Sequence, residues 1–167
     1  MIEIIKAGAL TTVQDLGRAG WAHLGVPRSG ALDAPALRSA NQLVGNPDDY
    51  AGLETTLLGC TVRLRRAATV AVTGADARVR VAGRDVETGV AVAVPEGALV
   101  EIGPARSGVR SYLAVDGGIA VEPVLGSRST DILSGLGPAP LRDGDLLPLG
   151  PANPAPASAE RVIRKPY

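Results

Sequence analysis

Aromatic residues are scarce in this chain of 167 residues: they make up 2%, with one Trp, three Tyr and no Phe. Hydrophobic residues nevertheless reach 46%, which excludes a wholly disordered chain. Because aromatic rings are not there to fill it, we expect a core of Val, Leu, Ile and Ala, whose branched and small side chains suit pleated sheets. The length is sufficient for one domain with a sizeable core.

Cysteine, histidine and lysine are also rare. The single cysteine, Cys60, excludes an intrachain disulfide and fits a reducing compartment. With one histidine and one cysteine there is no cluster of metal-ligand spacing, so we expect no metal site. The 17 basic and 17 acidic residues balance to a formal net charge of zero, which gives no general attraction to nucleic acid or to an anionic membrane.

Several functional motifs are missing as well. The sequence has neither a charged and apolar leader nor an apolar run of membrane-spanning length, and we expect a cytoplasmic protein. No glycine-rich run ends in Gly-Lys-Ser or Gly-Lys-Thr, so the chain has no P-loop for ATP. No Gly-x-Ser-x-Gly elbow and no Met-Lys pair for biotin attachment occurs.

Glycine and proline, by contrast, are abundant, with 21 and 13 residues. Between their turn signals lie short runs that are apolar, β-branched or alternate between polar and apolar residues, at 2–5, 61–65, 69–73, 78–81, 89–94, 98–102 and 109–115. At least seven short strands at roughly ten-residue spacing predict a mainly β fold whose sheet closes or nearly closes.

One helix is predicted over residues 34–44. Asp33 has the side chain of an N-cap, Pro35 stands in the first turn, and Gly45-Asn46-Pro47 ends the helix. A second short helix is expected to begin near Ser129, where Ser-Thr-Asp precedes two apolar residues.

The C-terminal part has a different composition. Residues 151–158 read Pro-Ala-Asn-Pro-Ala-Pro-Ala-Ser, which is typical of an extended, proline-stiffened linker. We therefore assign residues 1–150 to a β-barrel domain and residues 151–167 to a linker and the start of a second half that is missing.

The densest chemistry lies in residues 13–33. This segment holds four glycines, two carboxylates, two arginines, the only histidine and the only tryptophan. No hydrophobic period runs through it, so neither a packed helix nor a packed strand accounts for it. Such a density of glycine and charge favours a backbone shaped around a polar group, with a solvated, turn-rich loop as the alternative.

Structural interpretations of the charged residues stand beside the functional ones. Asp15 and Arg18 are three apart and could pair across a turn, and Asp33 could be only the helix cap. His23 follows an aromatic residue and could simply be packed. Glu54, at a strand edge, could close a salt bridge.

Arg110 and Tyr112 alternate along a predicted strand and therefore project to the same face, toward a cavity or toward a partner. The hydroxyl residues Ser127, Ser129 and Thr130 around Arg128 are similar to an anion-binding helix start, and they also fit simple capping.

Ordered motifs across the chain resemble a known family. They are Gln14–Arg18, Gly25–Asp33, Ala40–Asn46, Leu53–Thr56, Thr73–Asp76, Arg106–Val115, Gly117–Ile119 and Leu125–Asp131. In this order they are similar to the allophanate hydrolase subunit 2 family, also called the biotin-dependent carboxyltransferase family or the C component of 5-oxoprolinase. Members of this family have two cyclophilin-like β-barrel halves, and this chain resembles the first. The implied fold is a cyclophilin-like β-barrel with one or two short helices.

The resemblance implies a subunit of a bacterial, ATP-dependent 5-oxoprolinase complex that hydrolyses the lactam of 5-oxo-L-proline to L-glutamate. Its partners would be a sister subunit, called allophanate hydrolase subunit 1 or the B component of 5-oxoprolinase, and a third subunit. ATP would be used by the complex, and the isolated chain is expected to be inactive. The family implies two alternatives: a carboxyltransferase component of a urea carboxylase-like enzyme, with biotin as cofactor, and a non-enzymatic regulatory partner of a kinase inhibitor.

Both enzymatic functions act on a planar amide whose carbonyl oxygen gains negative charge, so the site needs preorganised donors. The catalytic candidates are Asp15, Arg18, His23, Asp33 and Glu54. The candidates for binding the substrate or an anion are Gln14, Gly25, Arg28, Ser29, Gly30, Arg106, Arg110, Tyr112, Ser127, Arg128 and Ser129.

Overall fold

A single curled sheet of ten strands forms most of the molecule in the computed structural model, which describes residues 1–161. The strands are β1 (Ile2–Lys6), β2 (Thr11–Gln14), β3 (Gly52–Thr56), β4 (Cys60–Leu64), β5 (Ala68–Val81), β6 (Arg84–Val86), β7 (Ala91–Val94), β8 (Leu99–Val115), β9 (Leu146–Leu147) and β10 (Glu160–Arg161). The helices are a 3-10 helix, η1 (Ala22–Leu24), and one α-helix, α1 (Ala34–Leu43).

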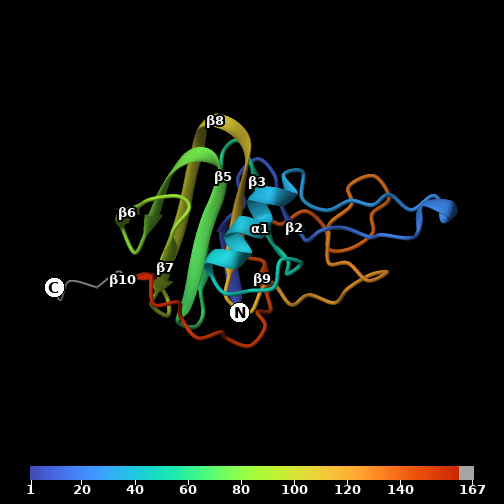
Figure 1. Cartoon of the computed structure of the whole chain (residues 1–167). Coiled ribbons are helices and arrows are strands. Elements are labelled where there is room, and N and C mark those ends of the chain that lie inside the picture. The colour runs from blue at the N-terminus through green and yellow to red at the C-terminus, as the bar shows by residue number, and fades with distance from the viewer. Residues whose placement is uncertain (162–167) are drawn as a thin grey trace.

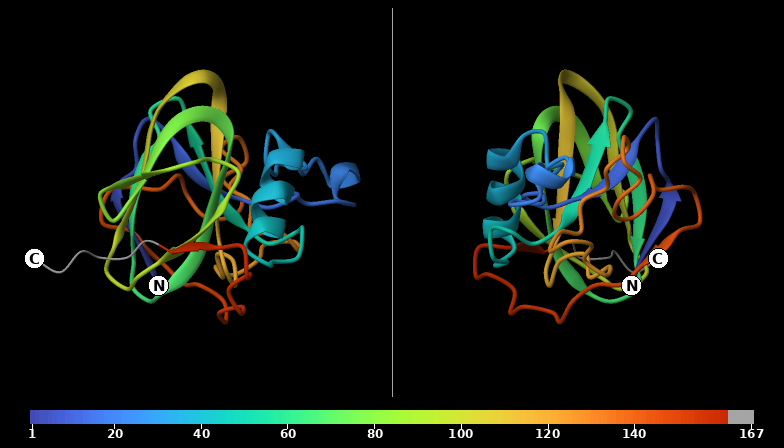
Figure 2. Two further views of the ribbon diagram at one scale, coloured as in Figure 1. Left: turned by 60° about the vertical axis from the view of Figure 1, so that its left-hand side comes forward. Right: turned by 90° about the vertical axis from the view of Figure 1, so that its right-hand side faces the viewer.

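The strand order is β10-β7-β5-β8-β4-β1-β9, with β3 on β8, β2 on β3, and β6 on β5. All neighbours are antiparallel except β10, which pairs in parallel with β7. The sheet wraps around itself, as the two views of Figure 2 show. The architecture confirms the expected mainly β fold of the cyclophilin-like barrel type.

Two strands are much longer than expected. The runs 69–73 and 78–81 both belong to β5, and the runs 98–102 and 109–115 both belong to β8. Their pairing register shifts between Gly74 and Val79 without ending the ladder. Because a bulge bends a strand rather than terminating it, both strands arch over the top of the sheet (Figure 1). The prediction of separate short strands was wrong here.

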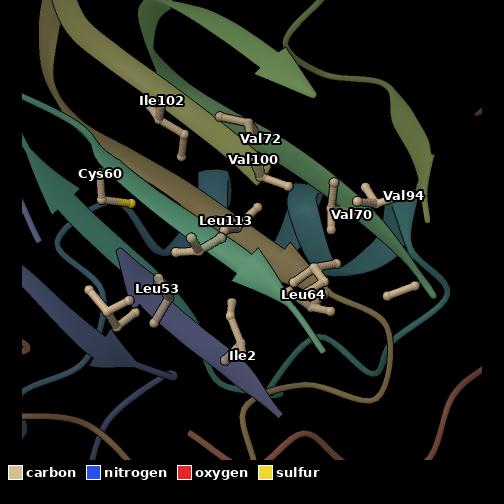
Figure 3. Close-up of a cluster of buried hydrophobic side chains, with 14 of the residues drawn as sticks. Ile2, Leu53, Cys60, Leu64, Val70, Val72, Val94, Val100, Ile102 and Leu113 are labelled. Carbon is tan, nitrogen blue, oxygen red and sulfur yellow. The ribbon is translucent and has the colours of Figure 1, made fainter. Parts of the chain in front are cut away.

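Alternate residues of β5 and β8 face two different layers. Val70, Val72 and Leu113 point into the main core (Figure 3). Val115, which pairs with Val70, belongs to the same cluster of Ile, Leu, Val and Ala side chains. On the opposite face, Ala71 and Ala114 pack against α1. Burying a Val or Leu side chain stabilises the fold by about 1.5–3 kcal/mol. The members of the main core cluster confirm the predicted core of Val, Leu, Ile and Ala.

Helix α1 forms as predicted. The Asp33 carboxylate accepts a hydrogen bond from the Ala36 amide at 3.1 Å, and Pro35 lies in the first turn. Leu37 and Ala40 are fully buried against the sheet.

The helix expected near Ser129 does not form. Residues 132–134 make a turn instead, in which Asp131 accepts from the Leu133 amide at 3.1 Å. Gly135 follows with a φ of 74°, a conformation that ends a helical turn.

The predicted linker begins without regular structure. Residues 151–156 have no helix or strand, and the Asn153 amide donates to the Asn46 Oδ1 at 2.8 Å. Residues 162–167 of the linker lie outside the described residues. The division into a domain and a linker remains a prediction. Within residues 1–161, no helix is long and apolar enough to cross a membrane.

Candidate functional site

The glycine-rich segment forms a two-armed ribbon between β2 and α1, which projects from the sheet in Figure 1. Its arms, residues 15–18 and 28–31, are joined by hydrogen bonds from the Arg18 amide to the Arg28 carbonyl at 2.6 Å and from the Ala31 amide to the Asp15 carbonyl at 2.9 Å. The tip carries η1 and is mostly exposed, including His23. The first arm carries hydrogen bonds to the 124–131 loop, and the first two residues of the segment, Val13 and Gln14, lie in β2 rather than in a loop.

Two glycines let the arms meet. Gly17 has a φ of 89°, and a Cβ there would lie 2.5 Å from the Arg28 carbonyl oxygen. Gly30 has a φ of 90°, and a Cβ there would lie 2.8 Å from the Gly17 nitrogen. Any side chain at either position would push the arms apart.

Asp15 anchors the first arm to the loop at 124–131. Its carboxylate accepts from the hydroxyls of Ser127 and Ser129 at 2.6 Å each. It also accepts from the amides of Gly17 at 2.8 Å and Arg128 at 2.7 Å. Burial on its own raises the pKa of Asp15, but these four hydrogen bonds outweigh burial and hold the pKa below its usual value. An anion with both oxygens engaged acts as a structural anchor rather than a general base.

Arg18 fixes the same loop. Its side chain is buried, with 2% of the residue exposed, and its guanidinium donates to the carbonyls of Val124 at 2.9 Å and Ser129 at 2.6 Å. The expected alternative, an ion pair between Asp15 and Arg18, does not form: within the described part of the chain the two side chains bind the loop separately.

A pocket of about 330 Å³ opens between the ribbon, the loop and the sheet. Its lining residues are Leu10, Thr12, Gln14, Pro27, Ser29, Glu54, Arg110, Thr130, Asp131, Ile132 and Leu133. Thr12, Gln14 and Glu54 alternate with the core residues Val13 and Leu53, so their side chains leave the opposite face of the sheet. The pocket therefore lies on the outside of the β2–β3–β8 surface.

Buried polar atoms without hydrogen-bond partners are concentrated in residues that line this pocket. Among the described residues, five buried side-chain nitrogen or oxygen atoms have no hydrogen-bond partner. Four of the five belong to residues that line the pocket: Gln14 Oε1, Ser29 Oγ, Arg110 Nε and Thr130 Oγ1. Buried polar groups are almost always hydrogen-bonded in folded proteins. A pocket lined by several residues whose buried polar atoms have no hydrogen-bond partner is suited to a small polar ligand.

Glu54 and Tyr112 form the base of the site. Glu54 Oε2 accepts from the Tyr112 hydroxyl at 2.7 Å and from the Leu32 amide at 2.9 Å. The Tyr112 oxygen accepts in turn from the Asp33 amide at 2.7 Å. Burial, and then the neighbouring Glu54, raise the pKa of Tyr112, so this hydroxyl remains a neutral donor.

Arg110 approaches Glu54 more loosely. Its Nε lies 3.3 Å from Glu54 Oε1, an ion pair without hydrogen-bond alignment. The salt bridge considered for Glu54 is thus present. A guanidinium has five N–H donors, so Arg110 retains capacity for a ligand.

The remaining predicted site residues lie apart from the pocket. His23 and Gly25 are on the exposed tip. The Arg28 side chain is exposed, and only the backbone carbonyl of Arg28 takes part in joining the arms. Arg106 is exposed and pairs with Asp76 at 2.8 Å. Asp33 caps α1, and Arg128 Nε donates to the Val121 carbonyl at 2.7 Å.

The structure thus separates the predicted residues by position. Gln14, Ser29, Glu54 and Arg110 line the pocket. Tyr112, Asp15, Arg18, Gly30, Ser127 and Ser129 support its walls. Sequence reasoning did not name Thr12, and it named Thr130 only with the hydroxyl residues around Arg128, not among the site candidates. Thr12 could have been found from its period-two relation to Gln14, and Thr130 from its place in the Leu125–Asp131 motif.

The pocket does not fit a nucleoside triphosphate. Arg110 is the one cation among its lining residues, and Glu54 and Asp131 bring two carboxylates. Within residues 1–161, no group of three His, Cys, Asp or Glu side chains is placed to hold a metal ion.

A larger hollow of about 590 Å³ lies elsewhere, lined in part by Lys6, Cys60 and Arg80. It holds none of the predicted site residues. Burial raises the pKa of the Cys60 thiol to about 11, which keeps it protonated and unreactive at neutral pH.

Comparisons with known proteins agree with the resemblance seen in the motifs. The chain is 46% identical over 153 residues to the C component of 5-oxoprolinase from Escherichia coli K12, a match that covers 90% of this chain and 49% of that protein. It therefore spans about half the length of that relative. The crystal structure of TTHA0988 superposes with a TM-score of 0.88 at 35% identity, covering 99% of this chain and 62% of that one. The K. lactis urea amidolyase superposes with a TM-score of 0.84 at 33% identity, covering 96% and 10%. Residues 24–167 match the family model described as carboxyltransferase domain, subdomain A and B, and the chain belongs to this family.

Proposed function

We propose that this chain is a subunit of an ATP-dependent 5-oxoprolinase complex and that its outer pocket binds the lactam of 5-oxo-L-proline. The similarity to the C component of the Escherichia coli 5-oxoprolinase supports the complex. The observation that carries the pocket assignment is that four buried polar atoms without a hydrogen-bond partner belong to residues that line one pocket of about 330 Å³.

The side chain of Gln14 is oriented by its neighbours. Its Nε2 donates to the Thr130 carbonyl at 3.1 Å and to the Thr12 hydroxyl at 3.0 Å. Because a carbonyl can only accept, the amide nitrogen must face it, and Oε1 is left as a free acceptor. This acceptor matches the N–H of a lactam.

Arg110 supplies hydrogen-bond donors and a positive charge, where Gln14 supplies an acceptor. Its guanidinium is the cation of the pocket and is held loosely by Glu54. A planar fork of donors suits a carboxylate. 5-Oxo-L-proline carries a carboxylate beside its lactam N–H, so Arg110 and Gln14 would bind adjacent groups of one molecule.

Partner subunits complete the proposed site. Ile132 and Leu133 line the pocket, and they are 62% and 93% exposed. Large apolar side chains at the rim of a polar pocket are typical of a surface that another chain covers. We assign this cover to the sister subunit, the B component of 5-oxoprolinase. We assign ATP to another component of the complex, because the pocket does not fit a triphosphate. The isolated chain would then be inactive.

The test is reconstitution. The sister subunit and the third subunit are mixed with ATP and 5-oxo-L-proline, with and without this chain, and glutamate release is followed. We expect release only when the chain is present. Gln14→Met, which keeps a side chain of similar length but removes the acceptor for the lactam N–H, should strongly reduce release, whereas Gln42→Met on the exposed surface of α1 should not. Equal glutamate with and without the chain would dismiss the proposal.

A second candidate is carboxyl transfer from biotin. It is favoured by the superposition with the K. lactis urea amidolyase. The ureido ring of biotin presents N–H and C=O groups like those of a lactam, so the polar atoms of the pocket fit it too. Transfer of a labelled carboxyl group from carboxybiotin to urea by the assembled subunits, with release of free biotin, would support this function. Tight association of the subunits with no turnover of either amide would instead support a regulatory role.

A further inference from the structure

Ser29 combines two features that are rarely found together. Its φ is 56°, a left-handed conformation that non-glycine residues seldom adopt. Its hydroxyl is buried and has no hydrogen-bond partner among the described residues. Both features cost stability, and such strain persists where the surrounding structure enforces it, often at functional sites.

The structure around Ser29 holds its backbone in this left-handed conformation. Ser29 stands on the second arm of the ribbon, between the Arg18–Arg28 hydrogen bond of 2.6 Å and the close approach of Gly17 and Gly30. The first arm is held in turn by Asp15 and its four hydrogen bonds to the ribbon and the loop. Ser29 therefore cannot relax to an ordinary backbone conformation without separating the arms.

Ser29 lines the same pocket as Gln14 and Arg110, and the buried, unpaired atoms of these two residues have known polarity. Gln14 Oε1 can only accept, and Arg110 can only donate. Ser29 Oγ can donate to a ligand oxygen. A bound amide whose N–H meets Gln14 and whose carboxylate meets Arg110 has one polar atom left, its carbonyl oxygen.

We infer that Ser29 is a catalytic residue whose hydroxyl donates a hydrogen bond to the carbonyl oxygen of the bound amide. This inference rests on the proposed function. The hydrogen bond stabilises the negative charge that this oxygen carries in the polarised amide and in a tetrahedral adduct. It uses one lone pair and leaves the other for activation of the oxygen. The strained backbone keeps the donor in place before the ligand arrives.

The test uses two substitutions that both remove the hydroxyl but differ in their effect on the backbone strain. In the reconstituted complex, Ser29→Ala removes the hydroxyl and keeps the strain, whereas Ser29→Gly removes the hydroxyl and relieves the strain. We expect both to lower kcat for glutamate release about 10²–10³-fold, as the loss of one preorganised donor does, with a smaller change in KM. We also expect Ser29→Gly to raise the melting temperature of the chain. Ser39→Ala, at an exposed serine of α1, is the matched control.

The outcomes separate the two proposals. A stable Ser29→Gly complex with wild-type kcat would overturn the inference and leave the proposed function standing, since the serine would then be only structural. A complex that releases glutamate equally well without this chain would overturn the proposed function and the inference with it. A stable but slow Ser29→Gly complex supports both.

Discussion

Asp15→Asn is the substitution that most sharply tests how the pocket is held together. The Asp15 carboxylate joins the ribbon to the 124–131 loop through two serine hydroxyls and two backbone amides, at 2.6–2.8 Å. Asparagine has nearly the same shape but presents an NH₂ group in place of one oxygen. If the NH₂ group takes the place of Oδ2, it faces the Arg128 N–H, so two hydrogen-bond donors oppose each other.

The size of the effect follows from these contacts. Hydrogen bonds to a charged group are worth about 1.5–3 kcal/mol each, and a buried donor left unpaired costs about 1–3 kcal/mol. Asparagine retains part of the bonding through its remaining oxygen, so we expect the free energy of unfolding to fall by about 3–5 kcal/mol. For a chain of this size that corresponds to a fall in Tm of about 6–20 °C.

The assay is urea and thermal unfolding followed by circular dichroism. Asp49→Asn, at an exposed carboxylate, is the matched control and should change stability by less than about 0.5 kcal/mol. An Asp15→Asn variant as stable as the control would refute the reasoning, because the four hydrogen bonds would then contribute nothing that a neutral amide cannot replace.

Three further predictions concern pH, the pocket and its base. The pKa of Asp15 is lowered in the folded state, so the ionised side chain contributes to the free energy of unfolding above its ordinary pKa of 3.8, and this contribution is lost as pH falls below that value. Unfolding measured from pH 6 to pH 2 should show this loss in the wild type and less of it in Asp15→Asn. Arg110→Gln should raise KM for 5-oxo-L-proline at least about tenfold by removing a charge-assisted pair, whereas the exposed Arg84→Gln should leave it unchanged; equal KM values in steady-state assays would contradict the binding role. Tyr112→Phe leaves a buried Glu54 oxygen and the Asp33 amide short of a partner and should destabilise the chain by about 1–3 kcal/mol in urea unfolding; an unchanged midpoint would contradict it.

The parts of the fold that local chemistry determines were predictable from sequence. Helix α1 follows from Asp33, Pro35 and the glycine stop, and each does in the structure what its residue type favours. The aliphatic core follows from the absence of Phe. Arg110 and Tyr112 were predicted to share a face, and both approach Glu54.

The parts that depend on distant contacts were not predictable in the same way. Asp15 meets Ser127 across 112 positions of sequence, and nothing in the spacing of either residue reveals this. Arg106 and Arg110 were both candidates for binding the substrate or an anion, yet Arg106 is exposed and Arg110 lines the pocket. The bulged register between β5 and β8 separates them, and that register is set by tertiary pairing rather than by local residue type.

The backbone of Ser29 is the clearest case. Serine in a glycine-rich loop predicts an ordinary turn residue. Its left-handed φ occurs where the close approach of Gly17 and Gly30 brings the two arms together. The local preference of serine and the fold disagree at this residue, which agrees with the catalytic role proposed for it.

The central claim is that the outer pocket of this chain binds the lactam. A crystal structure of the assembled complex with 5-oxo-L-proline tests it most directly. We predict density for the ligand in the pocket, with its N–H at Gln14 Oε1, its carbonyl oxygen at Ser29 Oγ and its carboxylate at Arg110. A ligand bound in another component of the complex, with this pocket filled only by water, would contradict it.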